Sequence, residues 1–258
     1  MIRHRNFLIF NLFMLLTWKS ESYANQEITV VVEHWPPWEI AKDEKKGMVT
    51  EGVAIDLLKE MLDRLGLVST LQTVPWKRAL TNMRRGKADL IPMISKNKKR
   101  EKYMLFTDII YKDTILLTYS NMRFPAFEWH HWKDLSGYSF QVVNGYNYGH
   151  SWDEAIIKYN FKVTTSISDI QSVRMLLGGR IDFIPVFNST RALLKEMPGF
   201  DSLKFAKKPI YETELYFGIS KKSPLASRLT EINGVLKSMK IDGTFNRILG
   251  SLAVTRPN

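Results

Sequence analysis

The segment GVAIDLLKEMLDRLGLVSTLQTVPWKRALTNMRRGKADLIPMI, residues 52–94, switches repeatedly between helical and strand patterns. Apolar residues recur at helical spacing through residues 52–65, and Gly66 is a suitable stop for a helix there. The segment then predicts a strand, a second helix and a further strand over residues 67–74, 76–85 and 88–94.

The chain upstream of this segment adds one strand and a rigid loop. Residues 28–32 form a short β-branched run that is typical of a buried strand. The loop His34-Trp35-Pro36-Pro37-Trp38-Glu39 follows, because two prolines can neither continue a sheet ladder nor enter a helix interior. Residues 42–46 are predicted to form an exposed hairpin tip. The order β-α-β-α-β indicates a mostly parallel sheet covered by helices.

The same pattern restarts downstream, after a predicted strand at residues 114–119 and an irregular stretch at 121–127. It predicts strands at 139–143, 161–164 and 181–186, with helices at 151–159 and 168–177. A last strand at 215–219 precedes two helices, at 224–239 and 243–249, which have no sheet of their own. We therefore expect an α/β fold of two lobes with two hinge crossings, with residues 25–118 and 211–258 in lobe 1 and residues 119–210 in lobe 2.

Residues 1–24 are predicted to be a signal peptide. Arg3 and Arg5 precede an apolar run, residues 7–18, and Ser22-Tyr23-Ala24 supplies small residues for cleavage. The run is shorter than the ~20 residues that a membrane span needs, although an uncleaved anchor is the alternative. This leader predicts a periplasmic protein.

Composition excludes several kinds of site. The 258 residues contain no cysteine, which excludes disulfides, thiolate metal sites and lipid attachment through an N-terminal cysteine. The formal net charge is +11, but the basic residues are spread along the chain apart from Lys96–Lys102, and export argues against a nucleic-acid partner. Adjacent His130 and His131 lack a third ligand at suitable spacing. We expect no metal and no cofactor.

A ligand site is expected where the loops at the carboxyl ends of the strands meet, in the cleft between the lobes. Hinge closure across the two crossing strands would then bury the ligand. The relevant loops are 34–39, 92–100, 144–149 and 185–188.

The chain resembles the family 3 extracellular solute-binding proteins, the polar amino-acid-binding components of ABC importers. Motifs at six places carry the resemblance in order: Trp35 to Glu39, Gly52 to Leu58, Gly86 to Leu90, Arg100 with Phe106-Thr107-Asp108, Gly178 to Asp182, and Lys237 to Gly243. The resemblance implies the type II periplasmic-binding-protein fold.

The resemblance also implies ligand-binding residues. Arg100, five residues after Ser95, would grip the ligand carboxylate, since a guanidinium meets a carboxylate with two parallel hydrogen bonds. Trp35, with Trp38 and Trp76 nearby, would form an aromatic wall. Tyr146 and Asn147 stand where the family often has small hydroxyl residues after a glycine. Two alternatives stay open. Arg100 could be a surface arginine in the charged run Lys96–Lys102, and the tryptophans could simply pack the loops.

One departure from the family pattern bears on the ligand. Where amino-acid binders place a carboxylate for the ligand ammonium, this chain has Phe187 and Asn188, and Asn188 brings no charge. A carboxylate without that amine, a modified amino acid or a small peptide-like molecule therefore remains open. Glu33, Glu39 or Asp153 could supply the charge instead.

These observations predict a monomeric binding protein that captures a small polar ligand for an ABC permease. No motif for catalysis is present, so we expect no enzyme activity. Two alternatives stay open: a protein that reports a ligand to a membrane receptor, and a dehydratase-like enzyme with Glu33 or Glu39 as acid or base.

Overall fold

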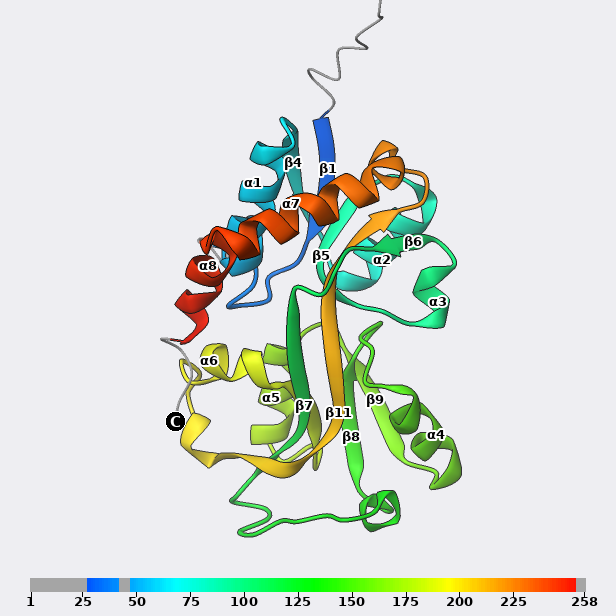
Figure 1. Ribbon diagram of the computed structural model, residues 1–258. Coiled ribbons are helices and arrows are strands. Elements are labelled where there is room, and N and C mark those ends of the chain that lie inside the picture. Colours follow the sequence, from blue (N-terminus) through cyan, green and yellow to red (C-terminus); the bar gives the residue numbers. More distant parts are fainter. Residues whose placement is uncertain (1–26, 42–46, 254–258) are drawn as a thin grey trace, which may run out of the picture.

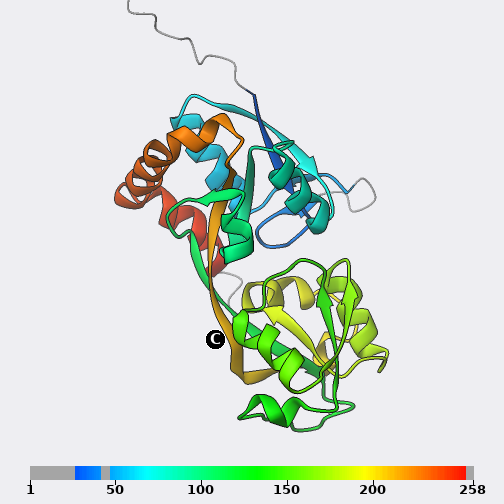
Figure 2. The ribbon, with the colours of Figure 1, turned by 90° about the vertical axis from the view of Figure 1, so that its right-hand side faces the viewer.

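The computed structural model describes residues 27–41 and 47–253. The predicted signal peptide and the predicted hairpin tip at 42–46 lie outside these residues. Two lobes are visible, one above the other, and two long strands run between them (Figure 1; Figure 2). No helix in this part of the chain has the length and apolar character that a membrane crossing requires.

Lobe 1 is built around a parallel core of three strands. β1 pairs in parallel with β4 along its whole length and with β5 at Val30. Helices α1, α7 and α8 contact one another on one side of the sheet, and α2 lies against β1 and β5 (Figure 1). The elements are β1 (Glu27–Val32), β2 (Ile40–Ala41), β3 (Val49–Glu51), α1 (Val53–Arg64), β4 (Val68–Thr73), α2 (Trp76–Arg85), β5 (Leu90–Ser95), α3 (Lys98–Glu101), β6 (Met104–Phe106), η4 (Pro224–Arg228), α7 (Leu229–Ile241) and α8 (Thr244–Ala253).

Lobe 2 repeats the arrangement on a smaller scale. β8 pairs in parallel with β9, and Phe140 of β8 forms a parallel bridge with Phe183 next to β10. A dense group of aromatic rings around Phe140, Trp152 and Phe183 fills its core. The elements are η1 (Trp132–Leu135), β8 (Ser139–Val143), α4 (His150–Lys158), β9 (Lys162–Ser166), α5 (Asp169–Leu177), β10 (Ile184–Phe187), η2 (Asn188–Thr190), α6 (Arg191–Leu194) and η3 (Phe200–Ser202).

β7 (Tyr111–Ser120) and β11 (Leu203–Ser220) connect the lobes. They pair antiparallel with each other, β11 also pairs with β5 and β6, and β7 pairs with β10, so one mixed seven-stranded sheet extends through both lobes. The two-lobed α/β fold with two crossings is confirmed. The lobe boundaries predicted at 118/119 and 210/211 fall inside β7 and β11, and they stay a prediction.

The crossing strands are longer than the sequence patterns predict. Only 215–219 was expected at β11, because its first half carries lysines and Pro209 that break apolar alternation. Pairing with β7 holds that half extended, with the register shifting on either side of Pro209. The pattern also misses α3 and β6, which are too short to show a period.

Candidate functional site

A narrow cavity of about 20 Å³ lies between the lobes, at the carboxyl ends of β1 and β5. Side chains from both lobes and from β11 close it. The lining residues are Glu33, Trp35, Trp76, Met93, Ser95, Arg100, Tyr146, Asn147, Phe187 and Leu215.

Arg100 is the cation of this cavity, and it is only 4% exposed. Its Nη1 donates to the backbone oxygen and to Oγ of Ser95, at 2.5 and 2.8 Å, and its Nη2 donates to the backbone oxygen of Gly145 at 3.0 Å. Burial lowers the pKa of Arg100 to about 10, so the group stays charged at neutral pH. Among the described residues no carboxylate pairs with it, so the charge is available to a ligand.

Ser95 and Asn147 extend the polar end of the cavity across the cleft. The Asn147 amide donates to Ser95 Oγ at 3.2 Å, which leaves that oxygen accepting from both Asn147 and Arg100. A hydroxyl that accepts two hydrogen bonds still has its own proton to donate. The cavity therefore offers a hydroxyl donor beside the guanidinium, which suits an oxyanion.

A bulge in β5 places Ser95 in the cavity. The pairing of β5 with β11 shifts register beside Pro92 and Met93, and Met93 has φ 47°. Positive φ in a non-glycine residue is strained and is often found at binding sites. Proline removes one ladder hydrogen bond, which favours a bulge at this position. The extra residue changes the direction of the side chains at the end of β5, so that Ser95 faces the Arg100 guanidinium.

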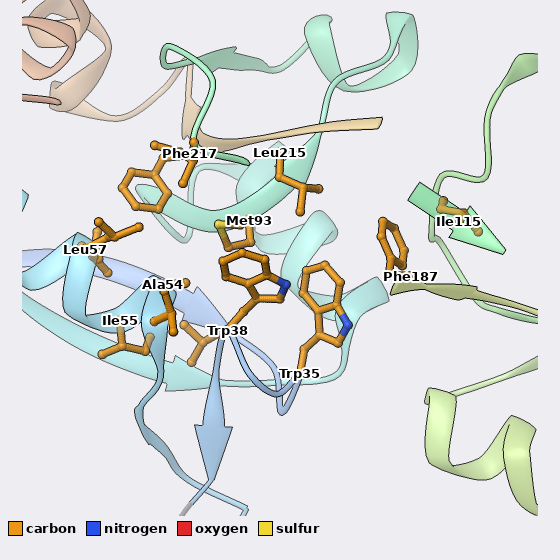
Figure 3. Close-up of a cluster of buried hydrophobic side chains, with 14 of the residues drawn as sticks. Trp35, Trp38, Ala54, Ile55, Leu57, Met93, Ile115, Phe187, Leu215 and Phe217 are labelled. Atoms are coloured by element: carbon orange, nitrogen blue, oxygen red, sulfur yellow. The ribbon is translucent and has the colours of Figure 1, made fainter. Parts of the chain in front are cut away.

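Aromatic rings form the apolar wall. Trp35 lies 5.1 Å from Phe187 in an edge-to-face contact and 6.2 Å from Tyr146, while Trp76 lies 5.8 Å from Tyr146. Figure 3 shows Trp35 between Trp38 and Phe187, with Met93 and Leu215 above it. The ring of Trp76 also faces Arg100, at 5.5 Å from the guanidinium carbon. This wall fits flat or aliphatic parts of a ligand.

Glu33 is the acidic group of the cavity. The Tyr146 hydroxyl donates to its Oε1 at 2.8 Å, which joins the lobes across the cleft. Burial raises the pKa of Glu33 to about 8, and the hydrogen bond from Tyr146 opposes that rise. The neighbouring Glu39 is buried, its Oε2 accepts the backbone N–H of Glu33 at 2.7 Å, and burial raises its pKa as well. Glu39 therefore stabilises the proline loop, whereas Glu33 faces the cavity.

Residues 28–251 match the profile of the bacterial extracellular solute-binding proteins, family 3. The chain belongs to this family. The resemblance drawn from the six motifs is thereby confirmed, and the family is one of binding proteins. A search of curated proteins finds no match.

Solved structures agree on the fold of this family 3 protein. It is similar to an ancestral arginine-binding protein bound to arginine (TM-score 0.77, 21% identity, 89% of this chain and 99% of that one). It is also similar to the arginine-, lysine- and histidine-binding protein ArtJ of Geobacillus stearothermophilus (0.75, 18%, 90% and 97%). A histidine kinase sensor domain with similarity to periplasmic binding proteins matches equally well (0.76, 15%, 89% and 96%). At these identities the likeness shows the fold and leaves the ligand open.

The solute-binding protein brings together most of the residues predicted from its sequence. Six of them line the cavity, and two do not. Trp38 is fully buried beside the cavity, with its ring 4.8 Å from Tyr111. Asn188 is exposed and accepts a hydrogen bond from Arg191 at 3.3 Å, because the chain turns into η2 there. The six are Trp35, Trp76, Ser95, Arg100, Tyr146 and Asn147.

Of the acids considered as a replacement charge, Glu33 alone lines the cavity, since Glu39 is turned to the loop and Asp153 is exposed on α4. The sequence patterns did not indicate Met93 or Leu215. Pro92 inside a predicted strand was the available signal for the bulge at Met93. Leu215 joins the cavity because β11 crosses it. Among residues 27–41 and 47–253, no group of three His, Cys, Asp or Glu could hold a metal ion.

Proposed function

We propose that this family 3 protein binds a small carboxylate-bearing ligand, an amino acid or a derivative of one, in the cavity between its lobes. The observation that carries the proposal is Arg100, a buried guanidinium that faces the cavity and has no acidic partner among the described residues. A ligand carboxylate would complete the charge balance.

The surroundings of Arg100 support this assignment. Burying an unpaired charge is costly, and a carboxylate of the ligand recovers that cost when it meets the guanidinium fork. Backbone and side-chain oxygens of Ser95 hold Nη1 in place, so the fork is oriented before a ligand arrives. The aromatic rings of Trp35, Trp76, Tyr146 and Phe187, which line the cavity, would supply apolar contact to the rest of the ligand.

The proposed role is delivery of this ligand to an ABC permease, from the periplasm and as a monomer. Membership in a family of extracellular solute-binding proteins supports it. A sensing role at a membrane receptor is the competing use of the same fold. Neighbouring genes separate the two: permease and ATPase genes favour transport, and a kinase or cyclase gene favours sensing.

A thermal-shift screen with amino acids, their derivatives and other small carboxylates tests the binding proposal. A ligand at a hundredfold excess over its Kd adds about 2.7 kcal/mol to stability. Arg100→Lys keeps the charge but loses the planar fork, and we expect its affinity for each hit to fall about tenfold or more. Lys99→Ala, an exposed neighbour on the same short helix, is the control and should bind as the wild type does. Equal affinity in Arg100→Lys and wild type would exclude the proposed site.

A second candidate function is acid–base catalysis, and Glu33 is the observation that favours it. Its carboxyl lines the ligand cavity, and its raised pKa of about 8 suits a group that donates and takes up protons near neutral pH. Incubation of each bound ligand with the protein, followed by mass spectrometry, separates the functions. Unchanged ligand supports binding alone, and loss of water that Glu33→Gln abolishes would show a dehydratase.

A further inference from the structure

A second pocket of about 350 Å³ opens beside the ligand cavity, on the far side of Glu33 and Tyr146. Glu33, Trp35 and Tyr146 line both spaces, so the Tyr146–Glu33 hydrogen bond is the partition between them. The remaining lining comes from the loop after β1, from the turn before β3, from the end of β4 and the loop before α2, from the start of α5, and from α6. Its members are His34, Gly47, Thr73, Val74, Pro75, Ile167, Ser168, Asp169, Ile170 and Leu193.

Asp169 is the feature of this pocket that needs an explanation. It is the first residue of α5 and is only 5% exposed, yet no described residue donates a hydrogen bond or an ion pair to its carboxylate. Its place in the first turn of α5 favours a negative charge, but it supplies no hydrogen bond to the carboxylate, and the helix is capped by Ser168, whose Oγ accepts the backbone N–H of Gln171 at 3.3 Å. A buried carboxylate is normally paired, so an outside partner is expected.

The inner cavity and the outer pocket differ in the charge of the residues that line them. Arg100 lies in the inner cavity, whereas the described lining of the outer pocket contains no lysine or arginine and has two carboxylates, Glu33 and Asp169. These two acids lie near enough to interact electrostatically. Trp35 and Tyr146, whose rings can face a cation, stand at the boundary. A ligand that spans both spaces therefore meets a cation at one end and two acids at the other.

We propose that the outer pocket accepts a cationic group, an ammonium or guanidinium, carried by a ligand whose carboxylate is held at Arg100, with Asp169 and Glu33 as its acidic partners. This inference rests on the proposed function and names the charge at the far end of the ligand. It also assigns a role to Tyr146, which must give up its hydrogen bond to Glu33 when the ligand passes between the spaces.

The ionisation of the two acids supports this arrangement. Burial raises the pKa of Asp169 to about 7 and that of Glu33 to about 8. Both carboxyls can therefore be neutral without a ligand near neutral pH, and an arriving cation favours their charged forms. Binding of a permanently charged guanidinium should release protons to the buffer.

Titration calorimetry with arginine and citrulline tests the inference, because the two molecules share size and carboxylate and differ in the charge at the far end. We expect arginine to bind wild-type protein about tenfold or more tightly than citrulline. Asp169→Asn should remove most of that preference while leaving the citrulline affinity unchanged. Asp153→Asn, an exposed aspartate on α4, is the matched control and should keep the preference.

The outcomes separate this inference from the proposed function. Equal binding of arginine and citrulline, both lost in Arg100→Met, would overturn the cationic subsite and leave the carboxylate site standing. A preference for arginine that Asp169→Asn retains would also overturn it. Binding of neither probe would contradict the inference and count against an amino-acid ligand altogether.

Discussion

At the scale of single residues, the groups that surround Glu33 are the part of the site that is hardest to predict from the sequence. Glu33 follows a buried strand and precedes the proline loop, and the sequence offers it only as one of three acids, with Glu39 and Asp153, that could supply a charge to the site. In the structure it faces Tyr146 and Asp169, with Glu39 and His34 close by. These neighbours come from both lobes, so only the folded chain produces the raised pKa.

This raised pKa predicts a pH dependence of stability. The folded chain keeps the Glu33 proton up to about pH 8, whereas an unperturbed glutamate releases it near 4.5. Between these values the folded state binds more protons, so the free energy of unfolding falls as pH rises, by at most about 1.4 kcal/mol per pH unit for this group. Glu33→Gln should flatten that decline.

Urea unfolding at several pH values between 4.5 and 8 measures the slope. Asp169 acts in the same direction at lower pH and remains in the variant, so part of the decline should persist. Glu196→Gln, at an exposed glutamate after α6, is the control and should match the wild type. A slope in Glu33→Gln equal to the wild-type slope would show that Glu33 titrates normally.

At the scale of elements, Gly52 joins the proline loop to α1 in a very close approach. Its φ is 124°, and a Cβ at this position would lie 2.3 Å from the backbone oxygen of Trp38. Gly66, after α1, has φ 65° but open space around it. Gly52 therefore combines a backbone conformation that essentially only glycine adopts (φ 124°, ψ 161°) with a close approach, whereas Gly66 has only the milder left-handed backbone.

Gly66→Ala should cost about 1 kcal/mol through the left-handed backbone alone. Gly52→Ala should cost about 3 kcal/mol, because its backbone conformation is less accessible to alanine and overpacking against the Trp38 carbonyl is added. Urea unfolding of both variants gives the comparison. Equal losses would mean that the loop moves away freely and does not hold Trp35 in place.

The short helix η2 connects the lobes through the two loop tryptophans. Trp38 Nε1 donates to Ser189 Oγ at 3.0 Å, and Ser189 Oγ donates to Asp113 Oδ2 at 2.6 Å. Trp35 Nε1 donates to Thr190 Oγ1 at 3.0 Å. These bonds join lobe 1 to lobe 2 and to the crossing strand β7, so they favour the arrangement in which the lobes touch.

Ser189→Ala should weaken this closed arrangement by about 1–2 kcal/mol, because one donor and one acceptor are lost together. Small-angle X-ray scattering of the ligand-free protein should then give a larger radius of gyration than the wild type. Ligand affinity should fall as well, since binding must drive more of the closure. Ser227→Ala serves as control, because Ser227 is exposed and its hydroxyl donates to the backbone oxygen of Pro224 at 3.0 Å, away from η2. An unchanged radius and affinity would contradict this role for η2.

Local periodicity predicted β1, α1 and α2 closely, because each of these elements buries a regular set of apolar residues. β4 was predicted as closely from its residue types, although none of its side chains is fully buried. It could not predict the length of β11, whose charged first half is held by pairing with β7. In the site, motif spacing indicated Arg100 and Ser95 together. The meeting of Glu33 with Asp169 had no signal, since the two residues are far apart in the chain and lie on different lobes.

At the scale of the whole molecule, the lobes complete one site that neither contains alone. Lobe 1 supplies Arg100, Ser95 and Trp35, and lobe 2 supplies Tyr146 and Asn147. Hydrogen bonds from Trp76 and Arg100 both end on the backbone oxygen of Gly145 in lobe 2, each at 3.0 Å. Binding and closure should therefore be coupled, because the ligand touches groups from both lobes at once.

The most direct test compares a ligand from the screen with its own carboxamide, by calorimetry on wild-type protein and on Arg100→Met. The amide keeps the size and planar shape of the acid, but it removes the charge that Arg100 would hold and replaces one acceptor oxygen with an NH2 donor. We expect wild-type protein to bind the acid at least about tenfold more tightly than the amide, and Arg100→Met to bind both equally weakly. Equal binding of acid and amide by the wild type would contradict a carboxylate site at Arg100.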